Sequence, residues 1–228
     1  MKKIGIITAR GGSKRIPKKN IRDFLGKPIM AYSIEAALSS NVFDEVMVST
    51  DDHEIAEVAL KYGAKIPFKR SEKTSNDTAT TTEVIIEVLS EYKKLGKIFE
   101  SVCCIYPTAP FITPDSLKYG LEALEKQSFS AAFTVVKYSY PVQRSLRVNS
   151  KGQLEMLYPE HSKSRSQDLE PVYHDAGQFY WFKTSEIKPS MELLKMNAFP
   201  IIIPETSVQD IDTEADWILA EMKYKSLL

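Results

Sequence analysis

The stretch that decides the fold is Ile4-Gly5-Ile6-Ile7-Thr8-Ala9-Arg10-Gly11-Gly12-Ser13-Lys14-Arg15-Ile16-Pro17-Lys18-Lys19-Asn20. Its apolar start predicts a buried strand that ends at a pair of glycines. Six basic side chains lie from Arg10 to Arg22, and no acidic residue occurs in this stretch before Asp23. Glycines at a strand end let backbone N–H groups approach an anion, and Arg and Lys add positive charge. The segment therefore predicts a loop that binds a polyphosphate.

This loop differs from the common glycine-rich phosphate loops. It has neither the Walker A spacing G-x-x-x-x-G-K-[ST] nor the dinucleotide pattern G-x-G-x-x-G. Pro17 disfavours the α region at Ile16, so the loop is not expected to run directly into a helix. We therefore expect side chains of a long, irregular loop to hold the phosphates. The alternative is a solvated basic turn without a ligand.

The composition is that of an ordinary globular protein. The 228 residues are 43% hydrophobic and 26% charged, which predicts a single domain, residues 1–228, with a sizeable core. The 30 basic and 30 acidic side chains cancel, so the net charge favours neither nucleic acid nor a membrane as a partner. Residues 4–9 are too short for a signal peptide, and we expect a cytoplasmic protein. Cys103 and Cys104 are adjacent in an apolar run and are predicted to be packing residues.

Strand and helix patterns alternate along most of the chain. Strands are expected at residues 3–9, 45–49, 65–68, 101–106, 131–136, 178–182 and 198–203. Helices are expected at residues 28–38, 54–62, 80–95, 114–126 and 213–227. This order predicts an α/β fold, with a mostly parallel Rossmann-like sheet and helices on both faces. Ligands of such sheets bind beyond the carboxyl ends of the strands, where the Arg10 loop lies.

Residues 137–173 break this alternation. They contain short strand-like pieces, turn residues and a polar patch, but no clear helix. We interpret them as an excursion from the sheet, a β-rich arm that exposes Tyr138, Tyr140, Tyr158 and Tyr173. Exposed aromatic side chains on an arm suggest contact with a second copy of the chain. The alternative is a loop packed on its own subunit.

The pattern Ala9-Arg10-x-Gly12-Ser13-Lys14-x-Ile16-Pro17-x-Lys19-Asn20 resembles the N-terminal signature of the acylneuraminate cytidylyltransferases, the CMP-sialic acid synthetases. The pattern is long and specific, and the resemblance extends to the last helix. It implies a fold of the nucleotide-diphospho-sugar transferase type that binds CTP. It also implies a homodimer in which the arm reaches toward the partner's active site.

Two carboxylates, Asp210 and Asp212, precede the last predicted helix. In an extended segment they lie on the same face, where two carboxylates favour a cation such as Mg²⁺. The alternative for Asp212 is an N-cap of the helix that begins near Thr213. The same D-x-D-T-E segment resembles the metal-binding site of the cytidylyltransferases, so the resemblance implies Mg²⁺ at Asp210 and Asp212.

The resemblance also implies roles for the nucleotide-binding residues. Arg10, Ser13 and Lys14, with Gly12 in the same loop, would hold the β- and γ-phosphates. Lys19 would stabilise charge at the α-phosphate, and Asn20 would orient the nucleotide. Arg70, the backbone at Ala79 and the Thr81 hydroxyl would recognise the cytosine base. From the residues alone, residues 77–82 are equally explained as helix capping by Asp77 or Thr78.

The sugar-binding side is predicted from four residues: Tyr106, Arg165, His174 and Gln178. Many relatives that activate sialic acid have glutamine at the position of Tyr106, so N-acetylneuraminic acid is the less expected substrate. The segments around Tyr158, Arg165 and His174 look most like the pseudaminic acid branch of the family. Arg165 suits a sugar carboxylate by its bidentate geometry. His174 is either a ligand or proton acceptor, or a structural residue.

Together these observations imply a CTP-dependent nucleotidyltransferase. It would convert CTP and a nine-carbon α-keto acid sugar, pseudaminic acid above all, into the CMP-sugar and pyrophosphate. Catalysis would rest on Arg10, Lys19, Asp210 and Asp212. The alternatives are legionaminic, N-acetylneuraminic or 3-deoxy-octulosonic acid as the sugar. An alternative of another class is a non-enzymatic protein that binds RNA phosphates, but such a protein is expected to have further basic patches with aromatic residues.

Overall fold

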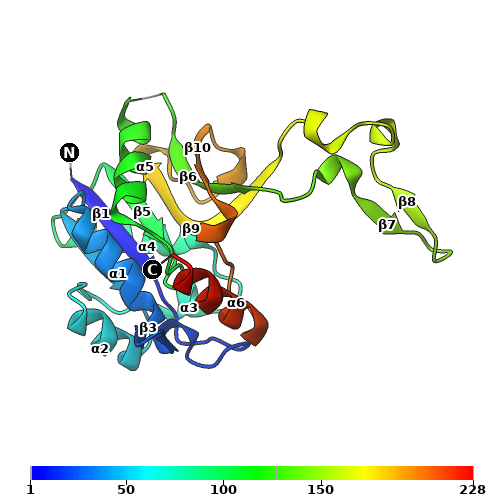
Figure 1. Ribbon diagram of the computed structural model, residues 1–228. Coiled ribbons are helices and arrows are strands. Elements are labelled where there is room, and N and C mark those ends of the chain that lie inside the picture. The colour runs from blue at the N-terminus through cyan, green and yellow to red at the C-terminus, as the bar shows by residue number, and fades with distance from the viewer. Residues whose placement is uncertain (1, 127, 228) are drawn as a thin grey trace.

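The central sheet has six strands. The computed structural model describes residues 2–126 and 128–227. The strand order is β10 (Ala198–Ile203), β6 (Ala131–Lys137), β9 (Tyr173–Lys183), β5 (Ser101–Ile105), β1 (Lys3–Thr8) and β4 (Glu45–Ser49) (Figure 1). β1 is parallel to β4 and β5, and β6 is parallel to β10, whereas β9 is antiparallel to both of its neighbours. The predicted α/β fold with a mostly parallel sheet is confirmed.

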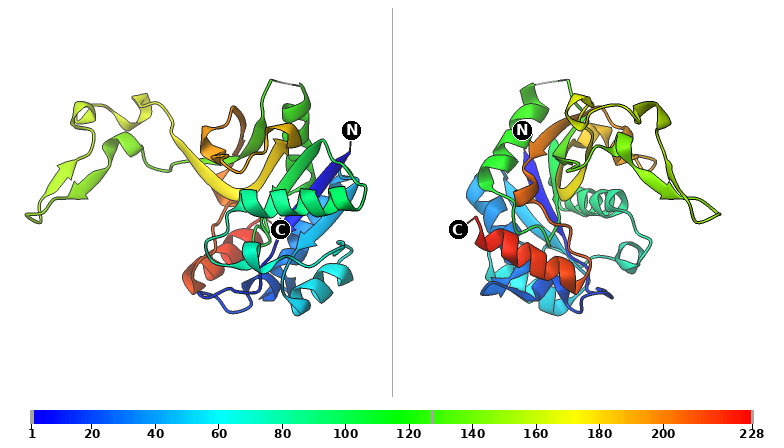
Figure 2. Two further views of the ribbon diagram at one scale, coloured as in Figure 1. Left: turned by 180° about the vertical axis from the view of Figure 1, so that it is seen from behind. Right: turned by 45° about the vertical axis from the view of Figure 1, so that its right-hand side comes forward.

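Helices cover both faces of this sheet. On one face, α1 (Ile29–Ser40), α2 (His53–Lys61) and α5 (Pro114–Lys126) contribute to one hydrophobic cluster. On the other face, α4 (Thr81–Lys94) packs its buried side chains against the second cluster (Figure 2). Cys103 belongs to the first cluster and Cys104 to the second, because successive side chains of β5 point to opposite faces. Burial raises the pKa of both thiols, that of Cys104 to about 12, which agrees with their predicted role in packing.

A third cluster anchors the basic loop. Ile16 is fully buried against Phe24, Ile211 and Trp217, so the loop after β1 packs on the segment before α6 (Glu214–Lys225). The loop leads into a 3-10 turn (Lys19–Ile21) and a small hairpin of β2 (Asp23–Phe24) and β3 (Lys27–Pro28) before α1 begins. As expected from Pro17, it does not continue directly into a helix. Burial of apolar side chains therefore joins the two ends of the chain at the candidate site.

Three local predictions differ from the structure. Residues 65–68 do not form a strand, and only Lys65 bridges to Met47, because Pro67 has no N–H with which to extend a ladder. β9 begins at Tyr173, well before the predicted residue 178. The short helix α3 (Glu72–Ser75) was not predicted.

The arm projects away from the sheet. Its tip is a hairpin of β7 (Leu146–Val148) and β8 (Leu154–Met156), and Figure 1 shows it well separated from the body of the molecule. 3-10 turns flank it at Val142–Arg144, Pro159–His161 and Ser166–Asp168. The remaining 3-10 turns are Thr184–Glu186, Leu193–Lys195 and Glu205–Ser207. Within the described residues, every helix is too short or too polar to cross a bilayer.

Candidate active site

A cavity of about 460 Å³ lies beyond the carboxyl ends of β1 and β5, where the fold predicts a ligand site. Its lining carries five cationic side chains, and none of the lining residues is acidic. The lining comprises Thr8, Arg10, Ser13, Lys14, Arg15, Lys19, Asn20, Arg70, Thr74, Asn76, Ala79, Thr81, Val84, Tyr106, Pro107 and Thr108. We call it the nucleotide cavity, after the ligand that the resemblance implies. It unites nine predicted site residues: Arg10, Ser13, Lys14, Lys19, Asn20, Arg70, Ala79, Thr81 and Tyr106.

The cations of the basic loop are paired with carboxylates from distant parts of the chain. Arg10 and Lys14 share Asp77, and Arg15 and Lys19 share Asp212. The hydrogen bonds from Lys14 and then Arg10 lower the pKa of Asp77. Outside the cavity lining, the pairs are Lys18 with Glu54 and Arg22 with Glu214. The acids that balance this segment thus come from tertiary structure and not from its own sequence.

The two glycines of the loop have different roles. A Cβ at Gly11 would lie 2.8 Å from Oδ2 of Asp52, and the Gly11 N–H donates to Oδ1 of Asp51 at 3.0 Å. Gly11 is thus required for the close approach of the loop to the start of α2. Gly12 is not a lining residue, and a Cβ there would meet only the Arg10 side chain at 3.5 Å. Gly12 was predicted to contact the nucleotide, but it lies outside the cavity lining. The N–H of Gly11 is already bonded to the Asp51 carboxylate.

Ser13 and Asn20 line the cavity but also hold the loop in shape. The Ser13 hydroxyl donates to the Ile16 carbonyl at 2.6 Å, and the Asn20 amide donates to the Arg10 carbonyl at 2.9 Å. Asn20 is nearly buried. These bonds fix the backbone that carries Arg10 and Lys14, so both residues contribute to the rigidity of the cavity.

Lys19 connects the basic loop to the Asp210–Asp212 segment. Its Nζ donates to the Ile211 carbonyl at 2.6 Å and lies 3.7 Å from Oδ1 of Asp212. Asp212 also forms an ion pair with Arg15, in which Nη2 of Arg15 lies 2.7 Å from Oδ1 of Asp212. The two sequence motifs are thus in direct contact.

Asp212 does not cap α6. Thr213 is the N-cap, and its hydroxyl and Asp216 form a capping box. The capping alternative for Asp212 is therefore wrong, because its carboxylate points to Arg15 and Lys19 instead. Asp210 lines a second cavity, which also contains His174 and Asp175. The pKa of Asp210 is raised, first by partial desolvation of its carboxyl and then by repulsion from Asp212.

The Asp210–Asp212 pair fits a magnesium ion that takes its remaining ligands from elsewhere. The mutual repulsion of these carboxylates would be relieved by a cation. Among the described residues, no group of three or more His, Cys, Asp or Glu side chains is arranged to hold a metal. Mg²⁺ commonly binds one or two carboxylates together with phosphate oxygens and water. The donor set therefore suits an ion that arrives with a polyphosphate.

The lining also contains the predicted base-binding residues Arg70, Ala79 and Thr81. Arg70 is 6% exposed, and its guanidinium donates to the Ser49 carbonyl at 2.6 Å and to the Ser49 hydroxyl at 2.9 Å. Burial lowers the pKa of Arg70, which the nearby Asp51 partly offsets. Thr81 begins α4, and Thr80 caps the helix with Glu83, so capping by Asp77 or Thr78 is wrong.

Tyr106 belongs to a network of hydroxyl groups. Its Oη lies 3.3 Å from the Thr81 hydroxyl, and burial raises its pKa. The neighbouring Tyr180 donates to Asp175 Oδ2 at 2.7 Å. Asp175 lines the second cavity, so this network extends from the nucleotide cavity toward the second one. Tyr180 and Asp175 had no predicted role, because an alternating strand pattern does not show which side chains meet.

The other predicted sugar-binding residues are dispersed. Arg165 lies on the arm, where its guanidinium pairs with Asp168 at 2.7 and 3.2 Å. His174 lines the second cavity, of about 330 Å³, and its Nδ1 lies 2.9 Å from the Asp175 carbonyl. Gln178 is 4% exposed, and its amide donates to the Ser207 carbonyl at 2.7 Å. This bond ties β9 to the turn at Glu205–Ser207, and Gln178 lines neither the nucleotide cavity nor the second cavity.

Two lining residues, Arg15 and Asn76, were given no role from the sequence, and the pairing of Asp77 with two cations of the cavity was not predicted either. Arg15 was counted among the cations but given no role, although it lines the cavity. Asn76 and Asp77 lie in the loop before α4. The partners of Asp77 are 63 and 67 residues away in the sequence, whereas Asn76 bonds to its own turn. Only the cluster of short polar residues at 74–78 signalled a turn there.

The fold and the cavity point to a class of protein: an α/β protein with a cavity at the carboxyl ends of its strands whose five cations suit an anionic ligand. A cytidylyltransferase family model matches residues 4–198. The chain belongs to the cytidylyltransferase family, whose members are CTP-utilising nucleotidyltransferases, and the predicted family is confirmed.

Relatives match along the whole chain. The pseudaminic acid cytidylyltransferase of Campylobacter jejuni is 45% identical over 225 residues, covering 99% of this chain and 97% of the relative. The CMP-N,N'-diacetyllegionaminic acid synthase of Legionella pneumophila is 34% identical and covers 97% of this chain and 95% of its own length. A solved CMP:2-keto-3-deoxy-manno-octonic acid synthetase shares the fold, with a TM-score of 0.74 at 20% identity over 100% of both chains.

Proposed function

We propose that this protein transfers the cytidylyl group of CTP to pseudaminic acid, an acidic nine-carbon α-keto acid sugar. The anomeric hydroxyl oxygen of the sugar bonds to the α-phosphorus, and the bond from that phosphorus to the bridging oxygen of the β-phosphate breaks. The products are the CMP-sugar, pyrophosphate and the hydroxyl proton. Similarity over the full length to a pseudaminic acid cytidylyltransferase supports this choice of sugar.

One observation carries the proposal. The nucleotide cavity has five cations and no acid in its lining, and Lys19 joins it to the Asp210–Asp212 segment. A triphosphate is the ligand whose charge fits this lining. Arg10, Ser13 and Lys14 would bind the β- and γ-phosphates, and Lys19 would stabilise charge on the α-phosphate in the transition state. Asn20 would orient the nucleotide.

The base would lie next to Arg70, Ala79 and Thr81. Arg70 has two of its donors fixed on Ser49, which holds the guanidinium in one orientation at the cavity. It would donate to the carbonyl of cytosine, with the Ala79 backbone and the Thr81 hydroxyl completing recognition. Since the Asn76 side chain fixes the turn that carries Ala79, this part of the cavity is formed before the nucleotide binds.

Asp210 and Asp212 would hold Mg²⁺. When bound, the ion would neutralise phosphate charge next to the attacking oxygen. For this, Asp212 must loosen its ion pair with Arg15, which then becomes available to the nucleotide.

The second cavity is the proposed position of the sugar. It shares Asp210 with the metal pair, and Lys137, His174 and Lys223 supply polar and cationic groups. An acidic sugar there would be adjacent to the carboxylate pair. We further propose a homodimer in which Arg165 of the arm contributes to the partner's site, and a cytoplasmic location where CTP is available.

Pyrophosphate release tests the proposal. The protein would be incubated with CTP, Mg²⁺ and, in parallel, pseudaminic, legionaminic, N-acetylneuraminic or 3-deoxy-octulosonic acid. We expect release with pseudaminic acid at a kcat/KM at least about tenfold above the other three, which corresponds to a single well-placed contact. Preference for another acid would reject pseudaminic acid but retain the chemistry. Silence with all four, together with a salt-sensitive RNA complex, would favour the binding protein.

A further inference from the structure

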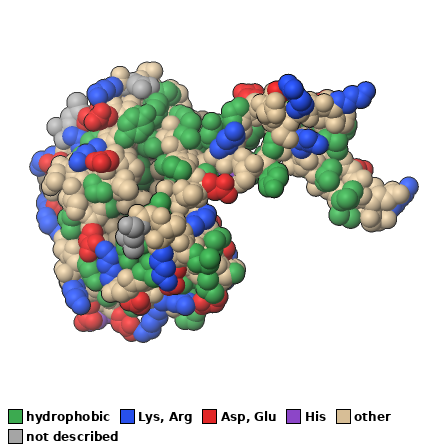
Figure 3. All heavy atoms as spheres, viewed as in Figure 1, with side chains coloured by type: hydrophobic (Ala, Val, Ile, Leu, Met, Phe, Trp, Pro, Cys, Tyr) green, Lys and Arg blue, Asp and Glu red, His purple; other side chains and the backbone are tan. Residues whose placement is uncertain are grey.

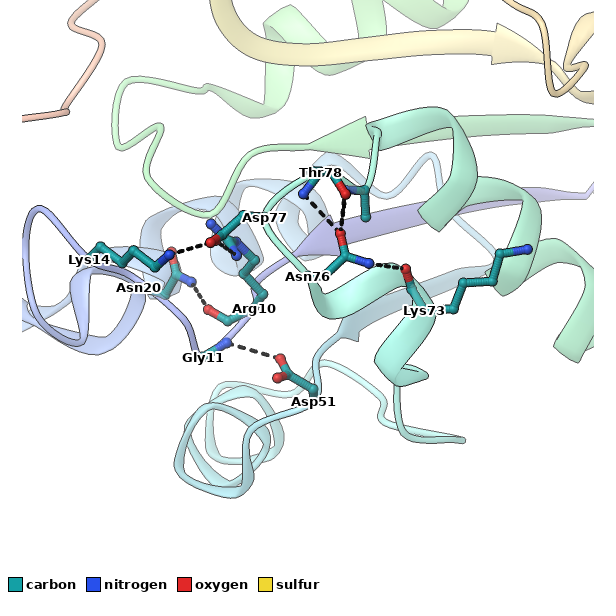
Figure 4. Close-up of polar contacts among 10 residues, drawn as sticks. Arg10, Gly11, Lys14, Asn20, Asp51, Lys73, Asn76, Asp77 and Thr78 are labelled. Atoms are coloured by element: carbon teal, nitrogen blue, oxygen red, sulfur yellow. Dashed lines mark hydrogen bonds and ion pairs between the residues drawn. The ribbon is translucent and has the colours of Figure 1, made fainter.

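Asp77 lies at the centre of the cationic side of the nucleotide cavity. Its Oδ1 accepts from Arg10 Nη1 at 2.6 Å, and its Oδ2 accepts from Lys14 Nζ (Figure 4). Each carboxylate oxygen thus occupies one cation, in the way that two oxygens of a phosphate would. Arg10 and Lys14 both line the cavity, whereas Asp77 does not.

The local structure around Asp77 does not need its carboxylate. Asn76 Oδ1 accepts the N–H groups of Thr78 and Ala79, both at 2.9 Å, and Thr80 caps α4. Figure 4 shows the Asn76 bonds directed into their own turn, while Asp77 reaches across to the basic loop. The carboxylate is therefore free to leave without loss of the turn that carries Ala79.

We propose that Asp77 is an internal anion that binds Arg10 and Lys14 and exchanges with the polyphosphate. This inference rests on the proposed role of Arg10 and Lys14 as ligands of the β- and γ-phosphates. A triphosphate displaces the carboxylate because it brings more charge to the same cations. After the transfer, Asp77 competes with pyrophosphate for them and promotes its release.

The competition between Asp77 and pyrophosphate predicts how the affinity for pyrophosphate changes when the carboxylate is removed. Asp77 is about half exposed, with 47% of its side chain accessible, so each ion pair is weak and can be exchanged. Removing its charge leaves Arg10 and Lys14 without an internal competitor. Affinity for pyrophosphate then increases roughly two- to tenfold, as expected for the loss of two exposed ion pairs. Affinity for cytidine, which has no phosphate, stays unchanged.

The test is calorimetric titration of Asp77→Asn and the wild type with inorganic pyrophosphate and with cytidine. Asp115→Asn is the matched control, because Asp115 is 93% exposed on α5 and its ion pair within the described residues is with Lys118. Tighter pyrophosphate binding in Asp77→Asn alone, with cytidine binding unchanged, supports the proposal. Unchanged or weaker pyrophosphate binding overturns it, and so does a loss of cytidine binding, since Asp77 would then belong to the built site.

A second variant and a second readout separate this inference from the function. Asp77→Ser should reproduce the shift, and thermal unfolding of both variants should match that of the wild type. Sugar transfer by the wild type is measured independently. Transfer without the pyrophosphate shift would overturn the role of Asp77 and retain the function. The shift without transfer to any sugar would retain the role of Asp77 and overturn the function.

Discussion

Lys19 shows how one side chain unites two motifs at opposite ends of the chain. Its hydrogen bond to Ile211 spans 192 residues, and both residues had been assigned to functional segments from sequence alone. What the sequence did not provide was the pairing itself. A basic residue in a loop has many acids within reach, and packing of Ile16 against Ile211 and Trp217 decides which one it meets.

Replacement of Lys19 by alanine should reduce turnover far more than nucleotide binding. We expect kcat to fall by about 10²–10³-fold, as for loss of a group that stabilises transition-state charge, with KM for CTP changed by less than about threefold. Steady-state kinetics with the preferred sugar would measure both parameters. Equal changes in kcat and KM would contradict a role in the transition state.

Two neighbouring variants make the Lys19 result specific. Lys18→Ala is the matched control, because Lys18 pairs with Glu54 outside the cavity, and its kcat should equal that of the wild type. Arg15→Ala removes the other cation on Asp212. If the Lys19 effect came only from a displaced Asp212, Arg15→Ala would reproduce it, whereas we expect a smaller loss.

Among the elements, those with a clear apolar period were predicted well. β4 and β10 have the predicted bounds, and α4 and α5 deviate by at most one residue at either end. The predicted strand at 65–68 failed because its apolar pattern contains Pro67, and the backbone cannot pair there. The antiparallel direction of β9 could not be predicted either, since it depends on the path of the arm and not on local pattern.

One polar contact between elements should make stability depend on pH. Glu45 of β4 is 7% exposed and accepts bonds from Lys65, Lys97 and the buried Tyr92 of α4. Burial alone would raise its pKa, but these hydrogen bonds outweigh burial and lower it below the usual 4.5. A lowered pKa in the folded state means that the charged form is stabilised. This contribution is present above pH 4.5 and is lost as the pH falls through the lower, folded value.

The variant Glu45→Gln measures this contribution. At pH 7 we expect it to lower the free energy of unfolding by about 1–3 kcal/mol, because three donors lose a charged acceptor. Urea denaturation at several pH values should show the difference from the wild type shrinking below pH 4.5. A difference that is constant from pH 7 to pH 3 would exclude the carboxylate charge as its cause.

At the scale of the whole molecule, the arm exposes apolar side chains that the described residues of the same chain leave uncovered. Val148 and Leu154 are 68% and 69% exposed, and Tyr140 is 87% exposed. Figure 3 shows apolar and basic side chains along the arm, well away from the body. An isolated two-stranded hairpin is marginally stable in water. A second copy of the chain that covers these side chains would account for both observations.

Polar substitution on the arm should therefore weaken self-association. We expect Val148→Ser combined with Leu154→Ser to shift the protein from dimer to monomer at micromolar concentration, as seen by sedimentation velocity. Ile98→Ser is the matched control, because Ile98 is also 69% exposed but lies on the body next to α4. A wild type that sediments as a monomer, or a double variant that remains a dimer, would contradict the role of the arm.

The alkylation rates of the two adjacent cysteines of β5 would report local unfolding of the helices that cover each face of the sheet. Because one thiol lies beneath the α1, α2 and α5 layer and the other beneath α4, each is alkylated only when its own layer opens. Their raised pKa values keep both unreactive in the closed molecule. The order in which Cys103 and Cys104 react thus shows which of the two helix layers separates from the sheet first. Since Thr81 at the start of α4 lines the nucleotide cavity, a bound nucleotide would selectively protect Cys104.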